Sequence, residues 1–270
     1  MTVRAQRRTL LGGALGVLGL AMAATGCGSD DAAPAPEKPR ALTGEEAELL
    51  ALVRFQLYSA SPIRVAMAWP GSPTISYAIT LDLREHRAYG TFATREDASE
   101  DDTDTGFAAW DLATVATAPG AVGDPPPDLG AWTQRAMSRQ YPHDIFLALA
   151  LNLGSDRPEN PALLRQSTAR YLRADELDGT RVSVLEGPQP ASATASPSAG
   201  GGSTESGRTR YWIDAEGSLL RFEAYLGQAQ GEFARIDVVR DDADTDAGDD
   251  SGGADAALRN RATEVLASRR

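Results

Sequence analysis

The sequence predicts an α+β domain built on a largely antiparallel β-sheet, for three reasons. Apolar and polar residues alternate over 65–69 and again over 75–83, and a Pro-Gly turn separates the two runs. Such alternation is typical of strands that bury one face of a sheet. Helical periodicity is confined to 44–59 and to the middle and end of the chain, so no strand–helix–strand repeat supports a parallel sheet.

The helices are predicted from capping residues and from apolar residues at helical spacing. Thr43 and Glu46 form a capping box that starts an amphipathic helix over 44–59. Three further segments begin or end at proline or at a capping residue: a helical turn over 133–140, a buried helix over 145–153 capped by Asp144, and a short helix over 161–166.

Seven or eight strands are predicted among nine candidate segments, and most of them should pair with the next strand in the chain. The run over 75–83 is followed by a returning strand over 88–93. Asp178-Gly179 and the acidic glycine turn at 214–217 have the composition of hairpin turns. The other strands are expected over 107–115, 170–174, 181–185, 209–213, 219–225 and 232–239.

Composition divides the chain into four segments. A domain over 43–240 carries the predicted strands, and a Pro-, Ser- and Gly-rich stretch at 188–207 is expected to be a disordered insertion within it. The other segments are a lipoprotein signal peptide at 1–27, a flexible tether at 28–42, and an acidic linker with a short helical tail at 241–270.

The N-terminus has the pattern of an export signal. Arginines precede an uncharged apolar stretch at 10–24 that is too short for a comfortable transmembrane helix. Ala24-Thr25-Gly26 then leads into Cys27, the only cysteine, and resembles a lipobox. Cys27 is therefore expected to carry acyl chains such as palmitate and to become the new N-terminus, although an ordinary signal peptide with an incidental cysteine is the alternative. Arg7-Arg8 also resembles a twin-arginine signal, against the general secretory route.

Charge and residue counts exclude several classes of protein. The chain has 26 basic and 38 acidic residues, which argues against nucleic acid as a partner. Without residues 1–26 the formal charge falls from −12 to −15, so attachment to the outer face of the cytoplasmic membrane should depend on the lipid. One Cys and two His leave no Cys-rich or three-His metal site, and no cofactor-binding pattern is present.

Motifs for catalysis and for calcium binding are incomplete. No G-x-S-x-G elbow occurs, and the only thiol is assigned to acylation. Adjacent His143 and Asp144 are interpreted as a turn and a cap, and His86 as a solvated turn residue. The acidic run at 242–246 opens like an EF-hand loop but lacks its glycine and its final glutamate. The sequence therefore predicts neither an enzyme nor a metal site.

Three short stretches resemble a known family. The segments at 128–132, 171–184 and 211–221 include an Asp-Gly-Thr-Arg strand start and a Tyr-Trp-Ile-Asp strand. Together with the lipobox they resemble the LppX/LprAFG-type actinobacterial lipoproteins and, more broadly, LolA-like carriers, over about residues 43–240. This resemblance implies a curved, half-open antiparallel sheet, a half barrel packed on a few helices, with an apolar cavity that takes acyl chains.

The candidate cavity residues lie in the strongest predicted hairpin. If the strands at 65–69 and 75–83 pair, residues of one phase form one apolar surface, which lines a lipid pocket or packs as ordinary core. These residues are Val65, Met67, Trp69, Ile75, Tyr77, Ile79 and Leu81. The expected function is a monomeric, surface-anchored protein that carries a lipid or acylated envelope molecule. The alternatives are a LolA-shaped protein-interaction or signalling module with a filled core, and an anchored enzyme.

Overall fold

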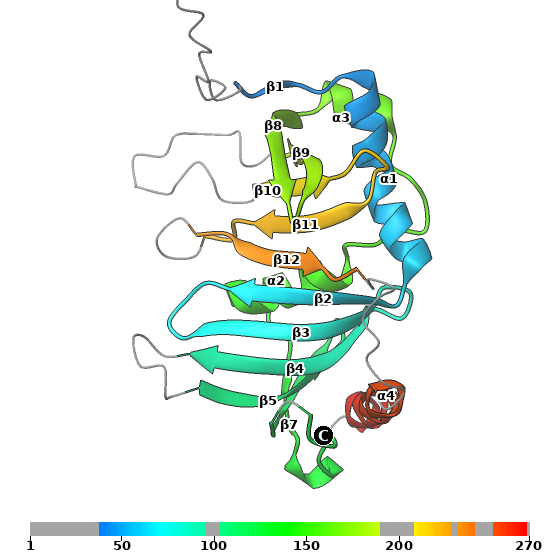
Figure 1. Ribbon diagram of the computed structural model, residues 1–270. Helices are drawn as coiled ribbons and strands as arrows, with labels where there is room; N and C mark the ends of the chain where they lie inside the picture. The colour runs from blue at the N-terminus through cyan, green and yellow to red at the C-terminus, as the bar shows by residue number, and fades with distance from the viewer. Residues whose placement is uncertain are drawn as a thin grey trace, which may run out of the picture. The chain divides into compact units, whose positions relative to one another are not determined.

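The computed structural model describes residues 38–95, 103–121, 123–189, 208–227, 232–240 and 251–268 (Figure 1). The predicted signal peptide with Cys27, most of the predicted tether, residues 190–207 of the predicted insertion and the acidic run at 241–250 lie outside the described residues. None of the helices in the described part of the chain combines the length and the hydropathy needed to cross a membrane.

One antiparallel sheet of twelve strands organises the described residues and confirms the predicted α+β class. It runs in the order β1-β8-β9-β10-β11-β12-β2-β3-β4-β5-β6-β7 and curves without closing into a barrel (Figure 1). The strands are β1 (Arg40–Ala41), β2 (Ile63–Trp69), β3 (Thr74–Asp82), β4 (Arg87–Arg95), β5 (Thr103–Trp110), β6 (Thr114–Pro119), β7 (Thr133–Ala136), β8 (Arg170–Leu177), β9 (Thr180–Glu186), β10 (Thr209–Ile213), β11 (Leu219–Ala224) and β12 (Ala234–Val238).

The helices pack on both faces of this sheet. They are α1 (Gly44–Ala60), α2 (Pro142–Leu151), α3 (Pro161–Gln166) and α4 (Ser251–Ala267), with a 3-10 turn η1 at Leu129–Ala131. Side chains of α1 and α2 share one core with the inward phase of β2 and β3, and we call this side of the sheet the inner face. Side chains of α4 pack with β4, β5 and β6 on the other side, the outer face.

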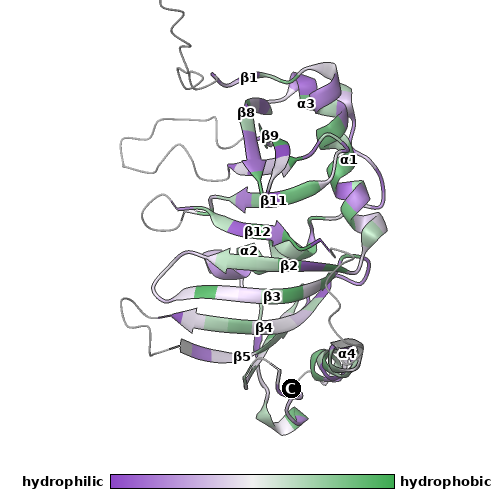
Figure 2. Cartoon of the chain, in the orientation of Figure 1, coloured by the Kyte–Doolittle hydropathy of each residue, from purple (hydrophilic) through white to green (hydrophobic). Residues whose placement is uncertain are grey.

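The β2–β3 hairpin has the predicted phase and register. Val65 pairs with Ile79 and Met67 pairs with Tyr77 across the two strands. The alternation is visible in Figure 2 as bands of green separated by paler residues along β3. The predicted Asp178-Gly179 turn is also confirmed, because both residues have positive φ, 48° and 77°, the combination that a two-residue hairpin turn requires.

The start of the domain is fixed by a capping box and a two-residue strand. The Thr43 hydroxyl accepts from the Glu46 amide, and the Glu46 carboxylate accepts from the Thr43 amide, as predicted. Arg40 and Ala41, expected to belong to the tether, instead pair with β8. The Arg40 guanidinium donates to both carboxylate oxygens of Glu46 at 2.8 and 2.7 Å and lies 4.0 Å from the centre of the Tyr171 ring.

Two predicted elements in the middle of the chain were wrong. The single strand expected over 107–115 is a hairpin of β5 and β6, because Asp111 accepts from the amides of Ala113 and Thr114 and turns the chain. The helical turn expected over 133–140 is instead the edge strand β7, which pairs with β6. Local propensity is a weak guide where a partner strand satisfies the backbone.

The capping role predicted for Asp144 was wrong, and the solvation predicted for His86 was only partly right. Helix α2 begins three residues before Ile145, at Pro142, and its N-cap is Tyr141, so Asp144 lies inside the first turn. Its carboxylate binds Arg135 and the Ser138 amide instead of capping the helix. His86 lies in the β3–β4 turn as predicted, but it is half-buried, with its Nδ1 3.0 Å from the carbonyl oxygen of Leu151.

The tail helix α4 was predicted as a short appendage but forms part of the core. Four apolar residues at helical spacing point at the outer face of β4–β6, where Tyr89, Phe107 and Ala116 are buried beneath them. These four residues are Leu258, Ala262, Val265 and Leu266. The domain therefore has three layers at this end: inner helix, sheet and outer helix.

Candidate functional site

Two of the pockets in the described part of the chain are lined both by α2 and by the inner face of the sheet. His143 and Leu147 of α2 contribute to a pocket over β3–β7, which we call the aromatic pocket. Leu149 of α2 contributes to a pocket over β10 and β11, which we call the leucine pocket. The fully buried Phe146 of α2 belongs to the core of this face.

The aromatic pocket has a volume of about 190 Å³. Its walls are mainly apolar and include three aromatic rings from three neighbouring strands, together with Ile75, Val115 and Leu147. The ring centres of Tyr77 and Trp110 are 6.0 Å apart, and those of Tyr77 and Phe92 are 6.3 Å apart. The polar lining consists of Thr94, Thr117, Thr133, Arg135, His143 and the Tyr77 hydroxyl.

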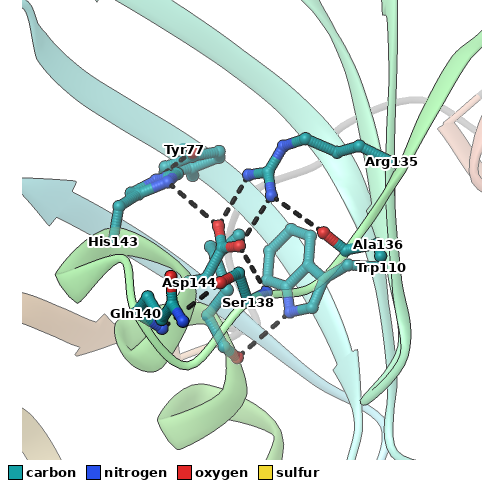
Figure 3. Close-up of polar contacts among 9 residues, drawn as sticks. Tyr77, Trp110, Arg135, Ala136, Ser138, Gln140, His143 and Asp144 are labelled. Atoms are coloured by element: carbon teal, nitrogen blue, oxygen red, sulfur yellow. Dashed lines mark hydrogen bonds and ion pairs between the residues drawn. The ribbon is translucent and has the colours of Figure 1, made fainter.

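A chain of polar contacts closes one side of the aromatic pocket (Figure 3). The Tyr77 hydroxyl is 2.8 Å from His143 Nε2, and His143 Nδ1 is 3.9 Å from Asp144 Oδ1. Asp144 is 1% exposed and accepts two hydrogen bonds of 2.6 Å from Arg135. Because Nδ1 faces a carboxylate, we assign the imidazole proton to Nδ1, so that the Tyr77 hydroxyl donates to Nε2.

Burial and pairing set the ionisation of these groups. Burial lowers the pKa of His143 to about 4; the charge of Arg135 adds to this effect and that of Asp144 opposes it. Burial raises the pKa of the Tyr77 hydroxyl. For Asp144, burial opposes ionisation, but hydrogen bonds from Arg135 and the Ser138 amide outweigh it and lower the pKa. At neutral pH the network therefore holds one compensated ion pair and two neutral rings.

This chemistry suits positioning better than covalent attack. A tyrosine that acts as a nucleophile must lose its phenolic proton. Burial raises the pKa of Tyr77 and so disfavours the phenolate. Trp110 is fully buried and donates its indole N–H to the Leu147 carbonyl at 3.1 Å, which fixes α2 against β5.

The expectation that the chain is not an enzyme stays a prediction.

The leucine pocket is larger, with a volume of about 400 Å³. Leu50, Leu149 and Leu153 lie on the helix side, and Tyr211 and Phe222, whose ring centres are 5.1 Å apart, lie on the sheet side. Arg54, Asn152, Glu159 and Thr209 form the polar part of the lining. Pro188 is the remaining lining residue. This volume falls within the range of roughly 300–1,000 Å³ that is usual for small-molecule sites.

Charge at the leucine pocket is compensated within the protein. Arg54 donates to Glu159 Oε1 at 3.0 Å. The same guanidinium donates to the carbonyl oxygens of Asn152 at 3.0 Å and of Gly154 at 3.4 Å. The pocket therefore has an apolar floor and a polar rim, and the two charged side chains of the rim neutralise each other.

The structure distributes the seven predicted cavity residues between pocket and core. Ile75 and Tyr77 line the aromatic pocket. Trp69 is partly buried against α2, 5.3 Å from the His143 ring and 5.7 Å from the Phe146 ring by ring centres. The other four are at most 3% exposed and pack in the inner core: Val65, Met67, Ile79 and Leu81.

Sequence reasoning missed Arg135, Arg54 and the leucine pocket. Arg135 lay in a segment expected to be helical, and only the β6–β7 pairing brings it to Asp144. Arg54 and Glu159 are 105 positions apart, so no local pattern joins them. The alternation in β10 could have indicated the leucine pocket. It places Tyr211 and Ile213 on the inner face, the same face as Phe222, the partner of Tyr211 on β11.

Some predictions concern groups that the site does not include. Cys27 lies outside the described residues, so its lipidation stays a prediction. Within the described ranges, no cluster of three or more His, Cys, Asp or Glu side chains could hold a metal ion.

Comparisons with known proteins give limited guidance. No family model matches the sequence, and no curated protein matches it. Among solved structures, the chain is similar to a DUF1329 family protein from Desulfovibrio piger, with 12% identity and a TM-score of 0.26, over 80% of this chain and 97% of that chain. The fold class rests on the sheet topology itself, and the resemblance to LppX/LprAFG-type lipoproteins stays a prediction.

Proposed function

We propose that this chain is a lipid-anchored protein of the cell envelope whose domain binds a lipid or acylated envelope molecule in the leucine pocket. One observation carries the proposal: a pocket of about 400 Å³ with a floor of leucine and aromatic side chains on the inner face. Each CH₂ group removed from water contributes about 0.8 kcal/mol, so an acyl chain can bind such a floor without any catalytic group.

The rim of the pocket suggests the headgroup. Because Arg54 is paired with Glu159 and with two backbone carbonyls, it offers little attraction to an anionic headgroup. The Thr209 hydroxyl and the Asn152 side chain are neutral groups. The Asn152 amide nitrogen already donates to the Ala148 carbonyl at 2.7 Å, so its oxygen is left to accept from a ligand hydroxyl. An acyl chain on an uncharged, hydroxyl-bearing headgroup, as in a glycolipid, matches this rim best.

The ligand should be found by extracting the purified protein with organic solvent and analysing the extract by mass spectrometry. Leu149→Trp places a bulky ring in the pocket from a partly exposed position and should reduce the amount of co-purified lipid at least fivefold. Leu163→Trp, at a 63% exposed position on α3, is the matched control and should leave it unchanged. An extract without lipid, or equal amounts from both variants, would contradict the proposal.

The proposed anchor can be tested separately. Replacing Cys27 by Ser removes the only thiol, and two or more acyl chains are what holds such a protein firmly on a membrane. The Cys27→Ser protein should therefore appear in the medium or the soluble fraction, whereas the parent sediments with membranes. Continued sedimentation of the variant would rule out the lipid anchor.

A second candidate function is favoured by the β2–β3 hairpin. Four of the seven predicted cavity residues are packed in the core, as a protein-interaction or signalling module with a filled interior would require. This candidate predicts an extract free of lipid and a protein partner that co-purifies with the chain. The extraction experiment therefore separates the two functions.

A further inference from the structure

The aromatic pocket differs from the leucine pocket in size, walls and charge. At about 190 Å³ it is roughly half as large. A dry apolar cavity of about 150 Å³ is enough to bind benzene, so this volume fits one ring and does not fit a long acyl chain. Size alone therefore points to a different ligand from the one proposed for the leucine pocket.

The walls favour a flat ring. Tyr77 is at the centre of three ring contacts: edge-on to Trp110, tilted against Phe92 and stacked at 19° on His143. Tyr77 and Trp110 are at most 8% exposed, and Trp110 is fixed by its indole hydrogen bond to α2. Rings held in place in this way present edges and faces to a guest without reorganising, and aromatic guests pack well against them.

The charges of the lining favour a neutral guest. Arg135 is the only lining residue with a permanent charge, and Asp144 compensates it with two hydrogen bonds of 2.6 Å. His143 stays neutral at physiological pH and is already bonded to the Tyr77 hydroxyl. An anionic guest would meet an arginine whose charge is already compensated by a buried carboxylate, and a cationic guest would find no acid in the lining.

The rim supplies neutral hydrogen-bonding groups. Thr94, Thr117 and Thr133 come from β4, β6 and β7 and all line the pocket. The Thr94 hydroxyl already donates to the Asp104 carbonyl at 3.4 Å and can still accept. The Thr117 and Thr133 hydroxyls can both donate and accept, so the three together can bond to a hydroxyl carried by the ring. We propose that the aromatic pocket is a second binding site, for an uncharged aromatic ring bearing a hydroxyl group, either as a free phenol or as the end group of a larger molecule. The inference does not depend on the proposed lipid function.

Binding can be measured by titrating the full-length protein with phenol, benzene and benzoate, using calorimetry or ligand-observed NMR. Phenol should bind, and benzoate, of similar size but anionic, should bind at least tenfold more weakly. 4-Butylphenol distinguishes the two sources, because retained affinity indicates a ring on a longer molecule and lost affinity indicates a free phenol. Failure of phenol to bind, or equal binding of benzoate, would overturn the proposal.

Two substitutions locate the site. Ala108 is 2% exposed and lines the pocket, so Ala108→Leu should fill it and reduce phenol affinity at least tenfold. Leu149→Trp, in the leucine pocket, is the control and should leave phenol affinity unchanged. Thr117→Val keeps the shape of the side chain and guards against a folding defect in Ala108→Leu. It should weaken phenol several-fold and leave benzene unchanged, whereas an equal effect on both ligands would contradict the assigned hydrogen bond.

Discussion

The outer face of the sheet is built differently in its two halves. Over β4–β6, which we call the covered half, Tyr89, Phe107 and Ala116 are buried under α4. Over β8–β12, which we call the charged half, arginine and acidic side chains take that position. There Trp212 donates to Asp175 at 3.0 Å, and the guanidinium groups of Arg173 and Arg221 each lie 5.9 Å from its ring centre.

The difference follows from the sequences of the strands. The run 107–110 is apolar in both phases and the run 115–118 is apolar except for Thr117, which is typical of strands buried on both faces. In β10 and β12, by contrast, Arg210 and Arg235 alternate with residues of the inner core. Long arginine side chains can cover apolar surface with their stems and keep their charge in water. One sheet can thus bury its second face under a helix or under its own charged residues.

The sharpest test of this comparison truncates one outer-face residue in each half. Phe107→Ala, beneath α4, should lower the free energy of unfolding by about 3–5 kcal/mol, because it leaves a cavity in a closed layer. Leu220→Ala, at a partly buried position of the charged half, should cost less than about 1 kcal/mol. Urea denaturation of both variants measures the difference. Equal losses would show that the charged side chains close their half as tightly as α4 does.

The opposite, inner face of the same strands should respond to pH through His143. Its folded-state pKa of about 4 lies below the ordinary 6.5, so the unfolded chain takes up the proton first. The contribution of His143 to the free energy of unfolding should be complete above pH 6.5, fall as the pH drops toward 4 and level off below that, with a total loss of about 3 kcal/mol. The measurement is denaturation at pH 7.5, 5.5 and 4.5 for the parent and for His143→Gln, whose amide oxygen can still accept from Tyr77. The same pH slope in both proteins would exclude His143 as its source.

The inner face allows a smaller comparison between a packed and a hollow position. Met67→Trp should overpack the filled core of the β2–β3 hairpin and destabilise the protein by about 1–3 kcal/mol. Leu149→Trp, beside the leucine pocket, makes the same kind of enlargement into open space and should cost well under half as much. Thermal melting of the two variants checks the order. A Met67→Trp protein as stable as its parent would reveal space in the hairpin core.

Much of the fold could be predicted because the relevant signals are local. The capping box of α1, the alternation in β2 and β3 and the Asp178-Gly179 turn each depend on a few neighbouring residues. The edge strand β7 and the split of residues 107–115 into two strands could not be read in this way. There the pairing partner decides the backbone conformation, and the partner is identified only in the folded sheet.

The site could be predicted only in part, for a related reason. The alternation places Ile75 and Tyr77 on the inner face, but it cannot tell pocket from core, because both need apolar side chains. What separates them is how completely the surrounding side chains fill the space: Met67 is buried in the inner core, whereas a volume of about 190 Å³ stays open beside Tyr77. The Arg135–Asp144 pair depends on the docking of α2 against an edge strand.

The two-residue strand β1 has a mechanical consequence. Any tension on the N-terminal segment, such as the proposed lipid anchor would exert, enters the sheet at Arg40. The Arg40 guanidinium forms an ion pair with Glu46 in the first turn of α1 and lies over the Tyr171 ring on β8. The backbone of Arg40 pairs with the same strand. A pulling force is therefore divided between the first turn of α1 and the edge of the sheet before it reaches the strands that form either pocket. Both pockets should then keep their shape while the N-terminal segment is under tension.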